Sequence, residues 1–210
     1  MSSPTLITPR RSHVFAKEAN GHYVEEQWCA RRLFEVEAFG AASAATILDP
    51  FCGWGRIPQA AIAAGYQVLA SDIVDRGARE RVPGLDFRVV DFFDPRGGDV
   101  GVRWPLSIVT NPPFDRVDVA IRRALEVATF KVAMIALWRR LPAARWLSAL
   151  PLYHIWLMTP RPSMPPGSFI EAGGKVGGGT QDFCWLVFLQ GYDGEPEVRW
   201  LRREPQGAGQ

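Results

Sequence analysis

A short apolar run that ends in an Asn-Pro-Pro-Phe turn constrains the fold of this chain more than any other feature. The residues at 106–110 (Leu-Ser-Ile-Val-Thr) predict a buried strand. After the turn, apolar side chains recur at helical spacing, at Val117, Ile121, Ala124, Leu125 and Ala128. The turn therefore lies at the carboxyl end of a strand in an α/β unit, which is where open α/β sheets bind their ligands.

The turn from Asn111 to Phe114 has a chemistry that suits a planar amino group. The lone pair of such a nitrogen is delocalised, so two acceptors aimed at its N–H bonds would draw it toward a tetrahedral, nucleophilic geometry. The side-chain oxygen of Asn111 and the carbonyl of Pro112 can supply them. Pro112 and Pro113 stiffen the turn, and Phe114 offers a flat face to an unstacked base. The alternative is a Pro-Pro turn whose aromatic side chain only packs.

Strand patterns alternate with helical patterns along the chain. We predict strands at 45–50, 67–73, 87–92, 106–110, 131–137, 153–159 and 183–190, and helices at 23–39, 57–64, 117–128 and 139–150. This alternation predicts an α/β fold with a doubly wound, mainly parallel, seven-stranded sheet. No helix separates the last two strands, so we expect the last strand to be antiparallel, at or near the sheet edge.

The same pattern predicts one domain at 21–203, a flexible amino-terminal arm at 1–20 and a tail at 204–210. The stretch at 161–182 is rich in Pro and Gly, and we expect a long loop there, of the kind that is usually functional or disordered. Residues 191–210 are predicted to form the end of a hairpin and a frayed tail.

Composition excludes several classes of protein. The apolar fraction of 47% and the charged fraction of 22% are those of a soluble globular protein. No apolar run is as long as a membrane span, and the first residues lack the apolar core of a signal peptide. Three cysteines without CxxC spacing favour neither disulfides nor a metal site, so we expect a cytoplasmic protein without metal. The net charge of +2 is too small to indicate nucleic acid by itself.

A second loop, Asp49 to Gly55, joins a predicted strand to the start of a helix. Its glycines let the backbone approach a ligand closely, and the helix amino terminus suits a carboxylate or a phosphate. A dinucleotide fingerprint is incomplete, because Pro58 stands where its third glycine belongs. The acidic Asp49 instead suits a ligand that carries positive charge, such as an ammonium or a sulfonium.

Two more acids follow at the ends of the next two predicted strands. Asp72 is placed to accept both hydroxyls of a ribose, and Asp91 to accept from the amino group of an adenine. Each acid alone could merely cap its strand, but together the three describe S-adenosylmethionine. We expect this cofactor to contact Asp49, Pro50, Phe51, Cys52, Gly53, Gly55, Asp72, Ile73, Asp91, Phe92 and Asn111.

On these two loops and two acids, the chain resembles the class I S-adenosylmethionine-dependent methyltransferases of the amino-N6 adenine type. Over residues 20–203 it is most similar to the small DNA adenine methyltransferases of phages and prophages. The resemblance implies the Rossmann-like methyltransferase fold, a target amino group held by Asn111 and Pro112, and a flipped base stacked on Phe114. It also implies that the segment with Tyr23 and Glu25 belongs to the cofactor site.

The implied activity is methylation of adenine N6 in DNA, with alternatives that the turn leaves open. These are adenine-N6 methylation of RNA and glutamine-N5 methylation of a protein. A non-catalytic binding subunit is a further alternative, against which the intact Asn111 and cofactor loop speak. Basic residues near the active face favour nucleic acid, and we expect contacts from Arg116, Arg139, Arg161, Lys175 and Gly177. The family's larger members carry a target-recognition domain, which this chain is not expected to have. The sequence does not predict the oligomeric state.

Overall fold

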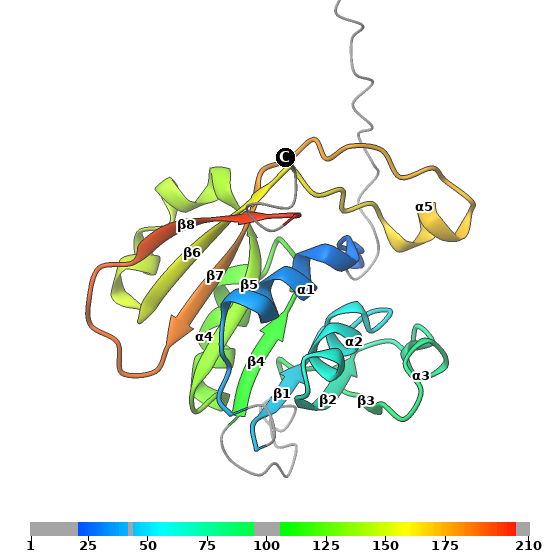
Figure 1. The fold of residues 1–210 in the computed structure, drawn as a ribbon, viewed down its shortest axis with the longest axis horizontal. Helices are drawn as coiled ribbons and strands as arrows, with labels where there is room; N and C mark the ends of the chain where they lie inside the picture. Colours follow the sequence, from blue (N-terminus) through cyan, green and yellow to red (C-terminus); the bar gives the residue numbers. More distant parts are fainter. Residues whose placement is uncertain (1–20, 42–43, 95–105, 205–210) are drawn as a thin grey trace, which may run out of the picture.

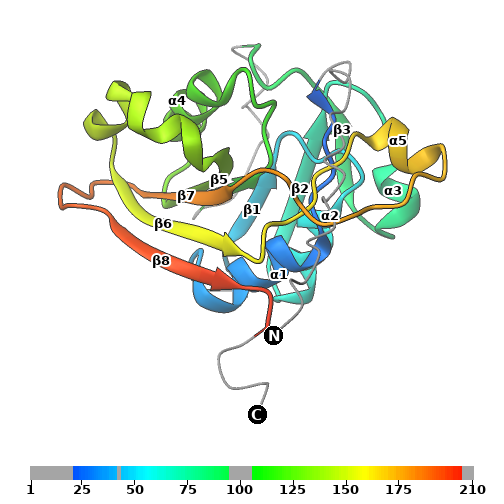
Figure 2. The same ribbon diagram turned by 90° about the horizontal axis from the view of Figure 1, so that it is seen from above.

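The computed structural model describes residues 21–41, 44–94 and 106–204, so the predicted arm at 1–20 and residues 205–210 of the predicted tail lie outside these ranges. Within them, eight strands form one sheet in the order β3-β2-β1-β4-β5-β7-β6-β8, with helices on both faces (Figures 1 and 2). The predicted doubly wound, mainly parallel fold is confirmed, but the sheet has one strand more than predicted.

The strands lie close to their predicted positions. Their bounds are β1 Thr46–Asp49, β2 Gln67–Asp72, β3 Asp86–Val89, β4 Leu106–Thr110, β5 Lys131–Leu137, β6 Leu152–Thr159, β7 Phe183–Leu189 and β8 Glu197–Arg202. All neighbours pair in parallel except β7, which is antiparallel to both β5 and β6. The prediction that the 183–190 strand is antiparallel is therefore confirmed.

The eighth strand corrects the prediction of a hairpin end and tail at 191–210. β8 pairs in parallel with β6 along its whole length, from His154 opposite Glu197 to Thr159 opposite Arg202. Within β8 only Leu201 is buried. The segment therefore lacks the run of apolar residues from which the other strands were predicted.

The helices divide between the two faces of the sheet. Their bounds are α1 Gln27–Val36, α2 Arg56–Ala63, α3 Ala78–Arg81, α4 Val117–Val127, η2 Trp138–Ala143, η3 Arg145–Ala149 and α5 Gly167–Glu171. α1 and α2 share a core with Trp185 of β7, whereas α4, η2 and η3 pack on the opposite face with Leu186 of the same strand. β7 is thus buried on both sides, which explains its uninterrupted apolar sequence.

Three predicted segments differ in detail. The helix predicted at 139–150 is two short 3-10 helices, because Pro142 cannot continue an α-helical hydrogen-bond ladder. The helix predicted at 23–39 begins only at Gln27, so Tyr23 and Glu25 precede it. The loop at 161–182 contains the short helix α5. No helix of the described residues is both long enough and apolar enough to cross a membrane.

A buried charge cluster ties α1 to β5 and β6. Lys131 Nζ donates to Glu37 Oε2 at 2.6 Å, and Trp156 Nε1 donates to Glu37 Oε1 at 2.8 Å. His154 Nδ1 contacts the same oxygen. Burial by itself raises the pKa of Glu37, but the hydrogen bonds from Lys131, His154 and Trp156 outweigh it and lower that pKa.

Replacement of Glu37 by alanine should therefore destabilise the protein by about 3–5 kcal/mol, since it leaves Lys131 buried without its partner. Because the folded pKa of Glu37 is depressed, its contribution is present above the unfolded pKa and is lost as the pH falls. Urea unfolding at several pH values measures both effects. The control is Glu126→Ala, which removes the exposed partner of Arg123 and should cost less than about 1 kcal/mol. Equal costs for the two variants would contradict the prediction.

Candidate active site

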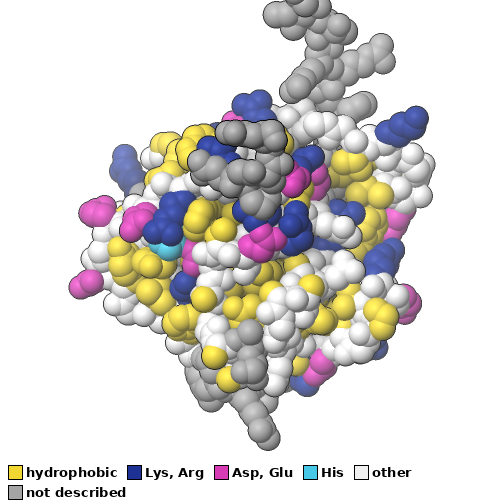
Figure 3. All heavy atoms as spheres, viewed as in Figure 1, with side chains coloured by type: hydrophobic (Ala, Val, Ile, Leu, Met, Phe, Trp, Pro, Cys, Tyr) yellow, Lys and Arg dark blue, Asp and Glu magenta, His cyan; other side chains and the backbone are white. Residues whose placement is uncertain are grey.

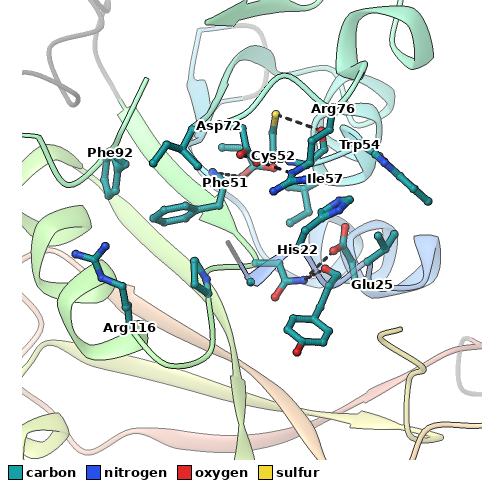
Figure 4. A pocket seen from close by; sticks show the side chains of 18 of the residues that line it. His22, Glu25, Phe51, Cys52, Trp54, Ile57, Asp72, Arg76, Phe92 and Arg116 are labelled. Carbon is teal, nitrogen blue, oxygen red and sulfur yellow. Dashed lines mark hydrogen bonds and ion pairs between the residues drawn. The ribbon is translucent and has the colours of Figure 1, made fainter. Parts of the chain in front are cut away.

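A cavity of about 240 Å³ lies among the described residues at the carboxyl ends of β1, β2 and β4. The sheet continues from β2 to β3 on one side of β1 and from β4 to β5 on the other, so strand order reverses between β1 and β4. Such a switch point is where doubly wound sheets bind ligands. Figure 4 shows Phe51, Phe92 and Arg116 at one end of the pocket and His22, Trp54 and Glu25 at the other.

Asp49 ends β1 inside this pocket and is 1% exposed. Its Oδ1 accepts from Thr110 Oγ1 at 2.6 Å and from the Phe51 N–H at 3.3 Å. Its Oδ2 is buried and has no partner within the described structure. Burial raises the pKa of Asp49 well above its usual range, against the hydrogen bond from Thr110. A cationic group in the pocket would relieve this cost.

The glycine-rich loop after Asp49 is held in a conformation that glycine favours. Gly53 and Gly55 have φ angles of +50° and +82°. A Cβ at Gly53 would lie 3.0 Å from His22 Nε2, so a larger residue would crowd the pocket as well. The Gly53 N–H donates to Asp72 Oδ2 at 2.9 Å, which ties the loop to the end of β2.

Asp72 lies at the end of β2, as predicted, and most of its side chain is buried. Its Oδ1 accepts from the Val74 N–H at 3.1 Å and lies 3.9 Å from Arg76 Nε. Burial raises the pKa of Asp72, although the backbone N–H groups of Gly53 and Val74 lower it. These contacts orient the carboxylate at the rim of the pocket.

Asn111, directly after β4, is fixed through its amide nitrogen. Nδ2 donates to the Tyr23 carbonyl and to Glu25 Oε2, both at 3.0 Å. The Tyr23 carbonyl can only accept, so this bond decides which end of the amide faces it. Asn111 Oδ1 is buried and has no partner within the described structure. The arrangement leaves an acceptor in the pocket that can meet an N–H donor.

The segment before α1 contributes Glu25, whose segment the family resemblance placed in the cofactor site, and His22, which the sequence did not assign to it. Glu25 is buried, and burial raises its pKa against the hydrogen bond from Asn111. His22 lies in the pocket, and burial, with Arg76 and Arg81 nearby, lowers its pKa to about 4. Sequence spacing gives no sign of either role, because hydrogen bonds between residues about 140 positions apart hold this segment: Val24 N–H to Pro165 O and Gly167 N–H to His22 O.

The opposite end of the pocket is aromatic. Phe51 and Phe92 meet edge to face with ring centroids 5.5 Å apart. Asp91 does not end its strand as predicted, because β3 stops at Val89. Asp91 instead begins a turn in which it accepts from the Phe93 N–H at 2.9 Å, and it remains in the pocket lining. Phe51, Phe92 and Asp91 thus frame a slot suited to a flat ring.

Most of the predicted cofactor residues line the pocket: Tyr23, Asp49, Phe51, Cys52, Gly53, Asp72, Ile73, Asp91, Phe92 and Asn111. Pro50 and Gly55 belong to the supporting loop and do not line it. Cys52 is buried, and burial, followed by Asp49 and Asp72, raises the pKa of its thiol. A thiol with a raised pKa is a poor nucleophile at neutral pH. Among the described residues, no group of His, Cys, Asp and Glu is placed to hold a metal.

Of the predicted catalytic turn, Asn111 and Pro113 line the pocket, but Pro112 and Phe114 do not. The Phe114 ring stacks on Tyr23 at 5.4 Å between centroids and packs against Phe183 at the same distance. The carbonyl of Phe114 accepts from Arg140 at 2.6 Å. Tyr23 therefore presents the pocket with the aromatic surface that the sequence assigned to Phe114.

The predicted polymer-binding residues are not gathered at one point. Arg116 lines the pocket and lies over the Phe93 ring at 3.5 Å, whereas Arg139, Lys175 and Gly177 are exposed outside it. Arg161 pairs with Asp182 at 2.6 Å, and this pair closes the two ends of the 161–182 loop. Figure 3 shows basic and acidic side chains interspersed on the face it displays.

Comparison with known proteins identifies the fold of this chain but no family to which it belongs. No family model and no curated protein matches the chain. Among solved structures, a type I restriction-modification methyltransferase subunit from Streptococcus thermophilus has a TM-score of 0.59 at 9% identity, covering 82% of this chain and 46% of that one. The ribosomal protein L11 methylase from Lactobacillus delbrueckii subsp. bulgaricus has a TM-score of 0.54 at 17% identity, covering 82% and 83%.

A proposed RNA methyltransferase from Pyrococcus horikoshii has a TM-score of 0.54 at 14% identity, covering 77% of this chain and 80% of that one. The chain spans less than half of the restriction-modification subunit, but most of the other two structures. The architecture is therefore the Rossmann-like methyltransferase fold. The descriptions of the three neighbours name different substrates, so the fold leaves the methyl acceptor open.

Proposed function

We propose that this protein transfers a methyl group from S-adenosylmethionine to the N6 amino group of adenine in DNA. The observation that carries the proposal is Asn111, whose Oδ1 is buried in the pocket without a partner while Nδ2 is fixed by Tyr23 and Glu25. A lone acceptor in a methyltransferase fold calls for an N–H donor, and an amino group supplies one.

The pocket residues suit the cofactor. Asp49, with its unpaired buried Oδ2, and Glu25 would hold the positively charged part of S-adenosylmethionine. Asp72 would accept from the ribose hydroxyls, and the Phe51–Phe92 slot with Asp91 would take the adenine ring. When bound, S-adenosylmethionine supplies an electrophilic methyl group on sulfur.

The catalytic turn would act on the acceptor nitrogen. Asn111 Oδ1 accepts one N–H of the amino group, and the Pro112 carbonyl is proposed to accept the other. Both acceptors favour the tetrahedral nitrogen that forms during transfer over the planar nitrogen of the free base, so they stabilise the transition state more than the ground state. Tyr23, which lines the pocket and is backed by the Phe114 ring, offers the aromatic surface against which an unstacked base could lie.

Nucleic acid is the proposed partner because exposed cations suit phosphates, and DNA is the polymer that the family resemblance implies. Arg116 lies at the pocket, Arg139 is exposed in η2, and Lys175 is exposed in the loop that follows α5. Arg161 would have to leave Asp182 before it could bind a phosphate. Contacts of this kind bind the DNA backbone and do not distinguish one base from another, so a short or weak sequence preference is expected.

The experiment is to incubate the protein with methyl-labelled cofactor and, separately, duplex DNA, single-stranded DNA, RNA and protein. Label should enter DNA, digestion should yield N6-methyladenine, and the initial rate at limiting DNA should fall steeply with salt. Single-stranded DNA should be methylated at least as well as duplex, since no base pair has to open. Label that enters only RNA, or only glutamine of a protein, would replace DNA as the substrate. Bound cofactor with no acceptor among the four would refute the proposal.

A further inference from the structure

The outer edge of β8 is the longer of the two free edges of the sheet. β8 lies next to β6, and no other described strand pairs with it (Figure 2). An edge strand is a template for another chain, and monomeric proteins usually blunt such edges with Pro, charged residues, a bulge or a covering element. β8 contains no Pro and pairs with β6 without a register shift, and its charged residues, Glu197, Arg199 and Arg202, are of both signs. Its Trp200 and Val198 are 62% and 55% exposed.

The backbone groups of β8 that face outward follow from its pairing. The Arg203 N–H donates to the Thr159 carbonyl of β6, so the alternation of a strand turns the groups of Val198, Trp200 and Arg202 away from β6. Arg32 Nε, from α1, donates to the Arg202 carbonyl, which agrees with an outward direction. The three residues with outward-facing backbone groups, Val198, Trp200 and Arg202, are therefore spaced symmetrically about Trp200.

We propose that β8 pairs antiparallel with β8 of a second copy of this chain, about a twofold axis at Trp200. Val198 then lies opposite the partner's Arg202, and Trp200 lies opposite the partner's Trp200. Trp200 and the partner's Trp200 exchange both of their backbone hydrogen bonds. The Arg202 carbonyl, which already accepts from Arg32, accepts from the partner's Val198 N–H with its second lone pair. The two indoles lie side by side on one face of the joined sheet, where Leu157 of β6 is their in-register neighbour.

Charge selects this register over its neighbours. With the axis at Trp200, Glu197 lies opposite the partner's Arg203, so opposite charges meet. Moving the pairing by two residues in one direction places Arg199 opposite the partner's Arg199, and in the other direction opposite the partner's Arg203. A shift by one residue would pair outward-facing groups with inward-facing ones. Like charges directly across a strand pair are unfavourable.

The proposed dimer leaves the two pockets independent. An antiparallel junction points the carboxyl ends of the parallel strands of the two copies in opposite directions, and the pockets lie at those ends. Within the described ranges, no residue of one copy then reaches the pocket of the other. Because one strand edge is a small interface, we expect a dissociation constant in the micromolar range.

Cysteine pairing tests both the dimer and its register. The native cysteines, Cys29, Cys52 and Cys184, are all buried, so an introduced surface cysteine is the reactive one. Under mild oxidation, an equimolar mixture of Val198→Cys and Arg202→Cys should give covalent dimer. Each variant alone should give little, because its two copies of the new cysteine are separated by about 13 Å along the strands. Covalent dimer in equal yield from the mixture and from each single variant would overturn the register.

Sedimentation velocity over a range of concentrations tests the dimer without any cross-link. The wild type should shift from monomer to dimer, and Trp200→Lys should remain monomer. The matched control is Val89→Lys, which places the same charge on β3, the opposite edge of the sheet, at a residue that is 59% exposed. It should dimerise as the wild type does. A wild type that stays monomeric throughout, or a Trp200→Lys variant that dimerises like the wild type, would refute the proposal.

Discussion

Replacing Asn111 by alanine is expected to lower kcat for methyl transfer by about a hundredfold or more, with a much smaller change in cofactor affinity. The lost Oδ1 acceptor matters most as the target nitrogen becomes tetrahedral, and removal of one such preorganised group typically costs about 10²–10³ in rate. Single-turnover methylation of a short DNA, alongside calorimetric titration of the cofactor, separates the two effects.

Asn111 also holds two neighbours, so the experiment needs a control for structure. Its Nδ2 bonds to Tyr23 O and Glu25 Oε2, and alanine leaves both acceptors without that donor. Glu25→Gln keeps an oxygen that can accept from Nδ2 and so should keep Asn111 in place, with kcat reduced far less than by the alanine variant. If Asn111→Ala loses cofactor affinity by the same factor as rate, its role is structural rather than catalytic.

The central sheet was predictable because its strands are buried on both faces. β4, β5 and β7 are nearly continuous apolar runs, and each was predicted within one residue of its ends. β8 was missed for the converse reason, since an edge strand with one buried residue carries no such run. Pro142 was visible in the sequence, but its effect was underestimated, and the predicted helix became η2 and η3.

From the residue patterns alone, the candidate site was predictable only where it is local in sequence, and the segment with Tyr23 and Glu25 was placed there only by the family resemblance. Asp49 to Gly55, Asp72 and Asn111 follow strands that could be recognised, and the topology brings strand ends together. His22 and Glu25 reach the pocket only because their segment is hydrogen-bonded to Pro165 and Gly167. The packing of Phe114 on Tyr23 and Phe183 likewise depends on contacts between distant residues, so no motif could indicate it.

Asp49→Asn is expected to have opposite effects on stability and on cofactor binding. The folded pKa of Asp49 is raised by burial, so its ionised form opposes folding of the free protein at neutral pH. Asparagine keeps an oxygen that can accept from Thr110 and Phe51 but never carries the charge. We therefore expect the Tm of the cofactor-free protein to rise, while cofactor affinity falls by about a hundredfold, as is typical when a buried charged partner is lost.

The raised folded pKa of Asp49 also predicts how stability and cofactor affinity depend on pH. A carboxyl whose folded pKa is raised contributes stability below its unfolded pKa, and this is lost as the pH rises through the folded pKa. A bound cation favours the ionised form, so cofactor binding should release protons and the affinity should increase with pH across that window. Glu25 and Asp72, whose pKa values are also raised by burial, add to the slope in the same direction.

Calorimetric titration of the cofactor in buffers of different ionisation enthalpy would measure the released protons directly. The wild type should release protons, and Asp49→Asn should release fewer and show a shallower increase of affinity with pH. Asp91→Asn is the matched control, because Asp91 lies in the same pocket but its side chain is exposed and lies outside the buried acid cluster. It should keep the wild-type slope. An Asp49→Asn variant with the wild-type proton release and affinity would show that Asp49 does not face the positive charge of the cofactor, and its unpaired Oδ2 would need another ligand.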